Sequence, residues 1–212
     1  MRTEYSNWRK LDNAALAFPL VTGENDTRVF RFYCQLKEEV DSDILQQALD
    51  RTMEKYPLFQ AVLRKGLFWF YLEHSHIRAL VKPETEPPCS RLYIPDKKSL
   101  LFQVSYYKER INFEVFHALT DGTGAMHFLQ ELVQNYLILA HPKENFPEIG
   151  RDKKTGRGNI EEDSFSQYYS SDIPKNREKK KAAVKLKGEK LVHSDMHISE
   201  VVLSVKEIHQ KA

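Results

Sequence analysis

The stretch INFEVFHALTDG, residues 111–122, joins a strand to a helix through a histidine. Apolar side chains alternate with polar ones up to Phe116, which is typical of a β-strand. After Asp121, apolar residues recur every three or four positions and predict a helix over residues 122–140. The imidazole of His117 is therefore expected at a strand end beside a helix N-terminus, where a titratable group can serve acid–base chemistry.

The residues alone leave the roles in this stretch open. His117 is either a strand-end histidine satisfied by a backbone group or a general base. The positive end of the following helix dipole disfavours a protonated ring, which favours the base. Asp121 is expected to be the N-cap of the helix, with pairing to an arginine or orienting the histidine ring as alternatives. Gly122 would permit a tight turn, because glycine adopts backbone angles that other residues avoid.

The rest of the chain mixes strand and helix patterns. A second helix is expected from a cap at Asp41 or Ser42 up to Pro57, and an earlier apolar segment from Trp8 is expected to stop at Pro19. Residues 82–88 are expected to be loop because their prolines cannot donate hydrogen bonds to a ladder. Strands are predicted over residues 27–36, 58–63, 67–72, 77–81, 100–107, 110–117 and 196–205.

Turn signals connect several of these strands. Lys65-Gly66 and Lys108-Glu109 are predicted to be the turns of two hairpins. Helices that alternate with partly antiparallel strands predict an α+β fold, a mixed α/β two-layer sandwich.

Composition excludes several classes of function. The 212 residues carry 32 basic and 30 acidic side chains, so no overall basic bias points to nucleic acid. Two cysteines, Cys34 and Cys89, do not make a disulfide framework, which favours a reducing, cytoplasmic setting. No apolar run approaches the roughly 20 residues that span a bilayer, so no transmembrane segment is expected.

Other candidate chemistry is weak. His74 and His76 share a strand face, but no third ligand lies nearby in sequence, so no metal site is predicted. Neither cysteine has the helix N-terminal context of a thiolate nucleophile. The chain has no nucleotide-binding or serine-nucleophile motif, and no residue can be named as a cofactor ligand.

The composition changes along the chain and suggests its domain organisation. Residues 150–192 are rich in Gly, Lys, Glu and Ser and are expected to be a flexible linker. The segment before it, residues 1–149, is expected to be the folded domain. Residues 193–212 are expected to hold one strand and the first turns of a helix.

His117, Asp121 and Gly122 match the pattern H-x-x-x-D-G, and in this context the chain resembles the chloramphenicol acetyltransferase-like superfamily. That superfamily includes peptide-synthetase condensation domains and alcohol acetyltransferases. Residues 43–59, a helix that ends in Tyr-Pro before a strand, are similar to its early helix, and residues 10–15 are similar to the opening of bacterial alcohol acetyltransferase-like proteins. The resemblance implies the N-terminal lobe of this fold over about residues 8–140, with the first elements of a second lobe at 193–212.

The resemblance also implies a reaction. His117 would take a proton from an alcohol or amine that attacks the thioester of acyl-CoA, a co-substrate and not a tightly bound cofactor. Asp121, tied to an arginine, and Gly122 would shape the site. Two alternatives are a condensation-type domain that acts on carrier-bound thioesters and a non-catalytic interaction module. Relatives carry a D-F-G-W-G-like segment in a second lobe, which is not found here, so the facing wall is expected from a C-terminal lobe or a second chain.

Overall fold

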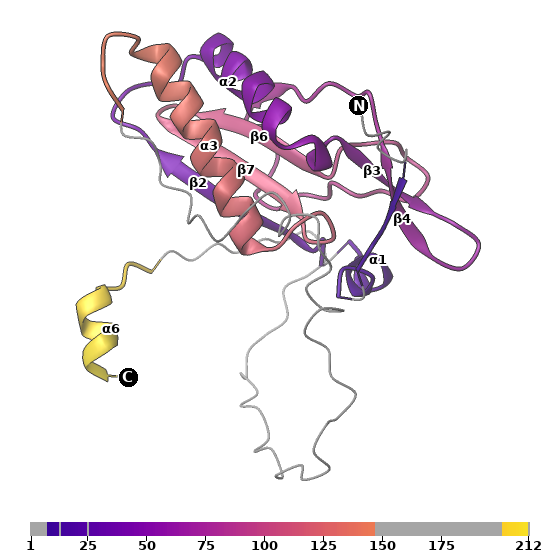
Figure 1. The fold of residues 1–212 in the computed structure, drawn as a ribbon. Helices are drawn as coiled ribbons and strands as arrows, with labels where there is room; N and C mark the ends of the chain where they lie inside the picture. The colour runs from indigo at the N-terminus through magenta and orange to yellow at the C-terminus, as the bar shows by residue number, and fades with distance from the viewer. Residues whose placement is uncertain (1–7, 13, 25, 147–200, 212) are drawn as a thin grey trace. The chain divides into compact units, whose positions relative to one another are not determined.

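The computed structural model describes residues 8–12, 14–24, 26–146 and 201–211 (Figure 1). The chain divides into two compact units, residues 1–171 and residues 172–212. The described part of the first unit holds two sheets and three α-helices, and the described part of the second holds helix α6 (Val205–Lys211). The candidate site lies in the first unit.

The larger sheet has the strand order β2-β7-β6-β5. Its strands are β2 (Val29–Gln35), β7 (Arg110–Phe116), β6 (Phe102–Tyr107) and β5 (Val81–Pro83). β7 pairs antiparallel with both β2 and β6, whereas β5 runs parallel to β6. Both faces of β7 are buried from Ile111 onward, because α3 packs on one face and the loop after β5 contacts the other.

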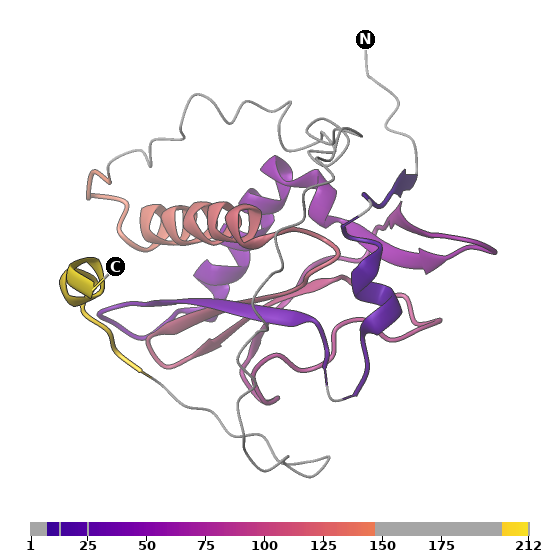
Figure 2. The same cartoon turned by 90° about the horizontal axis from the view of Figure 1, so that it is seen from below.

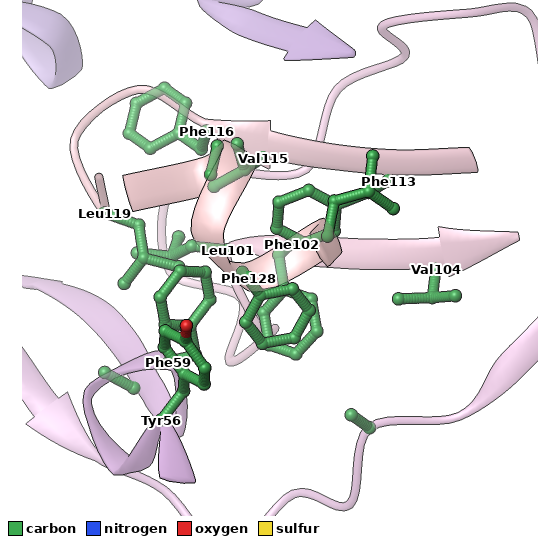
Figure 3. Packing of buried hydrophobic residues seen from close by; sticks show 14 of the residues in the cluster. Tyr56, Phe59, Leu101, Phe102, Val104, Phe113, Val115, Phe116, Leu119 and Phe128 are labelled. Atoms are coloured by element: carbon green, nitrogen blue, oxygen red, sulfur yellow. The ribbon is translucent and has the colours of Figure 1, made fainter. Parts of the chain in front are cut away.

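Two helices cover one face of this sheet, α2 (Ser42–Lys55) and α3 (Gly122–Ala140), as Figure 2 shows. Phe128 of α3 stacks on Phe113 of β7 with ring centroids 4.6 Å apart, and on Phe59 at 4.5 Å. Figure 3 shows this aromatic group between the helix and the strands. Apolar burial of this kind is the main stabilising term of a lobe of this size.

The smaller sheet has the order β1-β4-β3 with antiparallel neighbours. It consists of β1 (Trp8–Lys10), β4 (Phe70–His74) and β3 (Ala61–Lys65). A short helix α1 (Ala17–Val21) follows β1, and a single 3-10 turn η1 (Pro57–Phe59) leads from α2 into β3.

The mixed α/β layer fold predicted from the sequence is confirmed. Helix α3 has the predicted bounds, Asp41 caps α2 by accepting hydrogen bonds from the backbone of residues 43 and 44, and β6 and β7 turn at residues 108–109. Helix α6 also begins where a helix was expected.

Several local predictions were wrong. The β3–β4 turn spans residues 66–69, not Lys65-Gly66, because Leu67 and Phe68 belong to the turn and not to a strand. Strand β5 includes Pro83, which an edge strand tolerates. Pro19 lies in the first turn of α1, where a missing N–H is harmless, and does not end the segment. Residues 201–204 are not a strand.

The expected linker at 150–192 and residues 193–200 lie outside the described residues. The proposed boundaries at residues 149 and 192 therefore stay predictions.

Candidate active site

His117 follows the last residue of β7 and continues its pairing with the segment before β2. Its backbone N–H donates to the carbonyl of Arg28 at 2.9 Å. Arg28 adopts a left-handed conformation, with φ of 53°, just before β2 begins. The histidine backbone is thus fixed from both sides, by β7 before it and by this cross-strand hydrogen bond.

The imidazole of His117 is held by two aromatic rings. Phe18 of α1 stacks on it with centroids 4.2 Å apart and planes 11° from parallel. Phe30 of β2 meets it at 4.9 Å, tilted by 59°. Both nitrogens of an imidazole lie in the ring plane, so the stack on Phe18 does not cover them. The side chain is partly exposed, and across the described ranges neither ring nitrogen makes a hydrogen bond.

Asp121 is the N-cap of α3. Its carboxylate accepts a hydrogen bond from the backbone N–H of Gly124 at 2.8 Å. The residue is exposed, and it forms no ion pair with an arginine of the described segments. The arginine partner implied by the resemblance is therefore not present there, and the simpler expectation of a helix cap is the one the geometry supports.

Glycine is not required at position 122 by the backbone. None of the described glycines has a left-handed φ, and a Cβ on Gly122 would meet only the ring of Phe32 at 3.9 Å, an ordinary contact. The chain does turn between β7 and α3, at residues 117–119, but the turn does not use the backbone freedom of glycine at position 122. Gly124 is the crowded position, because a Cβ there would overlap the hydroxyl of Thr120. Gly122 and Gly124 lie two residues apart in the sequence, and only the packing of the folded chain shows that one has room for a Cβ and the other does not.

A buried cluster of charged side chains includes Glu114 of β7, the strand that leads to His117. Glu114, in the middle of β7, accepts hydrogen bonds from the Arg31 guanidinium at 2.9 Å and from the Gln103 amide at 2.7 Å. The backbone N–H of Cys89 also donates to it, at 2.5 Å. Arg31, Glu114 and Gln103 are direct partners in the register of β2, β7 and β6.

Glu84 extends the cluster. It pairs with Arg31 and accepts from Arg110 at 3.1 Å and from Asn112 at 3.2 Å. Burial alone would raise the pKa of Glu84, but the hydrogen bonds and positive charges of Arg31 and Arg110 outweigh it and hold that pKa below its usual value. Two cations and two carboxylates thus compensate one another in a partly desolvated setting.

This cluster attaches the loop after β5 to the sheet. The backbone of Cys89 makes two hydrogen bonds. Its N–H donates to Glu114, and its carbonyl accepts from the Thr27 hydroxyl at 2.7 Å. Thr27 immediately precedes Arg28, whose carbonyl receives the His117 N–H. The cluster therefore helps to set the backbone on which His117 lies. Sequence reasoning missed it, although opposite charges inside two predicted strands, Arg31 and Glu114, were the available signal.

The remaining candidates do not form a second site. Burial raises the pKa of the Cys34 thiol, and burial and the charge of Glu114 raise that of Cys89, which disfavours thiolate at either position. The His74 and His76 rings meet edge to face at 5.3 Å. Within the described part of the chain, no group of three His, Cys, Asp or Glu side chains is arranged to hold a metal ion.

No family model matches the chain, and no curated protein matches it. Solved structures do. The starter condensation domain of the rhizomide synthetase RzmA superposes with a TM-score of 0.53 at 12% identity, covering 67% of this chain and 40% of that one. The chain carries the fold of a condensation-domain lobe. This is the chloramphenicol acetyltransferase-like fold named from the sequence.

Two further structures agree. A variant of the RzmA domain in complex with C8-CoA gives a TM-score of 0.55 at 11% identity, covering 64% of this chain and 37% of that one. The X-domain in its complex with OxyB from teicoplanin biosynthesis gives a TM-score of 0.53 at 14% identity, covering 68% of this chain and 36% of that one. The chain thus spans about two fifths of the length of the condensation-type domains it matches. At these identities the likeness is one of fold.

Among the described helices, none combines the length and apolar character needed to cross a bilayer.

Proposed function

We propose that this chain is the histidine-bearing lobe of an acyltransferase, in which His117 is the general base for transfer of an acyl or acetyl group from acyl-CoA to an alcohol or amine. One observation carries the proposal. The His117 ring stacks on Phe18 and contacts Phe30 at a tilt, while its nitrogens make no hydrogen bond to the described protein. A structural histidine would be expected to use its nitrogens, whereas a base must keep one available for the substrate.

The reaction needs no covalent enzyme intermediate. A ring nitrogen of His117 accepts the proton as the acceptor oxygen or nitrogen attacks the thioester carbonyl carbon. The tetrahedral intermediate then collapses with cleavage of the carbon–sulfur bond, and the imidazolium returns the proton to the departing CoA thiolate. The raised pKa values of Cys34 and Cys89 are consistent with a route that uses no thiolate of the enzyme.

The aromatic contacts of the ring have a chemical use in this scheme. Stacking on Phe18 limits rotation of the imidazole, so the nitrogen that accepts the proton would be presented in one direction. A partly apolar setting also strengthens electrostatic interactions with a developing charge. Donors for the oxyanion are proposed to come from a facing lobe, in this chain or another.

Acyl-CoA turnover tests the proposal, with the 212-residue chain alone and mixed with a candidate C-terminal lobe. His117→Gln should lower turnover by about 10²–10⁴-fold, while the lobe stays folded and the loss of the Phe18 stack lowers its melting temperature only slightly. His127→Gln, on the neighbouring helix α3, is the matched histidine control and should retain activity. If neither preparation shows turnover that depends on His117, the proposal is wrong.

A condensation-type reaction on carrier-bound thioesters is the second candidate. It is favoured by the solved neighbours, one of which is a variant of the RzmA domain in complex with C8-CoA and Leu-SNAC. The same turnover assay separates the two, with free acyl-CoA in one arm and the acyl group on a phosphopantetheinyl carrier protein in the other. Activity that requires the carrier would select condensation. A stable lobe that is inactive in both arms would select the non-catalytic module.

A further inference from the structure

The turn between β3 and β4 exposes three large apolar side chains in succession. The backbone N–H of Gly66 donates to the carbonyl of Trp69 at 2.8 Å and closes the turn. Leu67 is 95% exposed, Phe68 88% and Trp69 54%. Turn tips are normally built from small polar residues, so such a tip is an apolar patch that calls for an explanation. Figure 1 shows the hairpin reaching outward, away from α2 and α3.

Basic side chains lie directly behind this tip. The register aligns Arg64 of β3, Tyr71 of β4 and Lys10 of β1 in one row across the small sheet. Lys65 pairs with Phe70 one position nearer the turn. We call Lys10, Arg64 and Lys65 the basic row.

The basic row has a surplus of positive charge. Glu73, one step further from the tip, pairs with Arg64 at 2.6 Å. Lys10 and Lys65 form no ion pair with any described residue. Two cations are therefore left uncompensated next to an apolar tip.

Amphipathic aromatic residues lie on either side of these cations along the hairpin. Trp8 of β1 is half exposed and contacts the edge of the Tyr71 ring, with centroids 6.3 Å apart. Trp69 at the base of the turn is also half exposed. Along the hairpin, Leu67 and Phe68 lie outermost, followed by Trp69 and Lys65, and then by the row of Tyr71, Arg64 and Lys10, with Trp8 two positions further back.

We propose that this hairpin docks the chain on an anionic phospholipid surface. An apolar tip with tryptophan, tyrosine and basic side chains behind it matches the chemistry of a bilayer interface, where apolar groups enter the acyl chains and aromatic and basic side chains meet the anionic headgroups. Because a lipid layer is fluid, a protruding tip can insert into it without a preformed complementary pocket. The docking requires no acyl transfer and stands independently of the role of His117.

The test measures binding of the 212-residue chain to vesicles of phosphatidylcholine, with and without phosphatidylglycerol. Flotation should recover the chain with the anionic vesicles, less with the neutral ones, and less again at high salt. The chain has two tryptophans, so Trp8→Phe leaves Trp69 as the only indole reporter. Its emission should shift to shorter wavelength and be quenched by brominated acyl chains.

Variants separate the tip from the basic row. Leu67→Ser with Phe68→Ser should weaken binding to anionic vesicles by about 100-fold, because two apolar side chains no longer leave water. Lys10→Gln with Lys65→Gln should weaken it by about 25-fold, roughly fivefold per cation, and leave the neutral vesicles unaffected. Leu80→Ser, an exposed leucine elsewhere on the lobe, is the control and should bind like the parent chain. Circular dichroism should show all variants folded, because the changed side chains are exposed.

Three results would overturn the proposal. The first is a parent chain that stays free of anionic vesicles at low salt. The second is a tip variant that binds as well as the parent. The third is a dimer, detected by light scattering without lipid, that the tip variant abolishes, since the tip would then be covered by a second copy.

Discussion

Replacing Arg31 with glutamine is expected to destabilise the lobe strongly, by about 3–5 kcal/mol at neutral pH. Arg31 is the cation that serves both carboxylates of the buried cluster, Glu84 and Glu114. Without it, Glu84 keeps Arg110 at 3.1 Å, but Glu114 keeps only neutral donors. The Glu114 side chain is 1% exposed, so water cannot replace the lost cation.

The expected loss of stability comes mainly from Glu114, which keeps no cation when Arg31 is replaced. Removing one member of a buried pair leaves the other charge desolvated and uncompensated, which is far more costly than losing an exposed pair. Arg64→Gln is the matched control, because its ion pair with Glu73 is about one third exposed on each side and is worth about 0–1 kcal/mol. Both substitutions remove one arginine from a β-strand and leave one glutamate without a cation, Glu114 in the first case and Glu73 in the second.

The difference between parent and variant should depend on pH. The pKa of Glu84 is lower in the folded state than in the unfolded chain, so its contribution to stability is present above the unfolded pKa of about 4.3. That contribution is lost as the pH falls through the folded pKa. The stability gap for Arg31→Gln should therefore be widest near neutral pH and should narrow below about pH 4.

Urea unfolding followed by far-UV circular dichroism at pH 7 and at pH 3 measures these free energies. An unchanged m-value would show that the variants unfold in the same way. The reasoning is refuted if Arg31→Gln costs no more than Arg64→Gln at pH 7, or if its cost grows as the pH is lowered.

Three further predictions concern the histidine loop and the thiols. Asp121→Ala should lower the free energy of unfolding by about 0.5–2 kcal/mol through loss of the α3 cap, whereas Asp121→Asn should retain most of it, as thermal melts would show. Gly124→Ala should destabilise the lobe, because its Cβ would overlap a threonine hydroxyl, while Gly122→Ala should melt no lower than the parent; the reverse order would contradict the packing. Cys34 and Cys89 should react with a disulfide reagent at pH 7 more slowly than a free cysteine and faster in denaturant, because burial raises both pKa values; rapid native reaction would disprove this.

Local signals explain which elements were predictable. Helix α3 and the cap of α2 depend on apolar periodicity and on a side chain that bonds the backbone two or three residues ahead. The prediction of the β3–β4 turn was wrong because it also relied on local signals. Its sequence, Leu67-Phe68-Trp69, has the composition of a strand, and nothing local distinguishes an exposed tip from a buried strand.

The candidate site divides in the same way. Its strand–histidine–helix order, with His117 after the strand and Asp121 at the helix cap, is a property of twelve consecutive residues and was available from the sequence alone. The aromatic contacts of the ring were not, because Phe18 and Phe30 reach His117 from other elements.

The sequence by itself therefore determined the layer fold, the bounds of its longest helix and the placement of one histidine. Tertiary structure decided what surrounds that histidine, why Glu114 tolerates burial, and that the β3–β4 tip is exposed. The physical reason is range. Periodicity and capping act within a few residues, whereas the partners of a side chain follow from strand order and register, which only the folded chain sets.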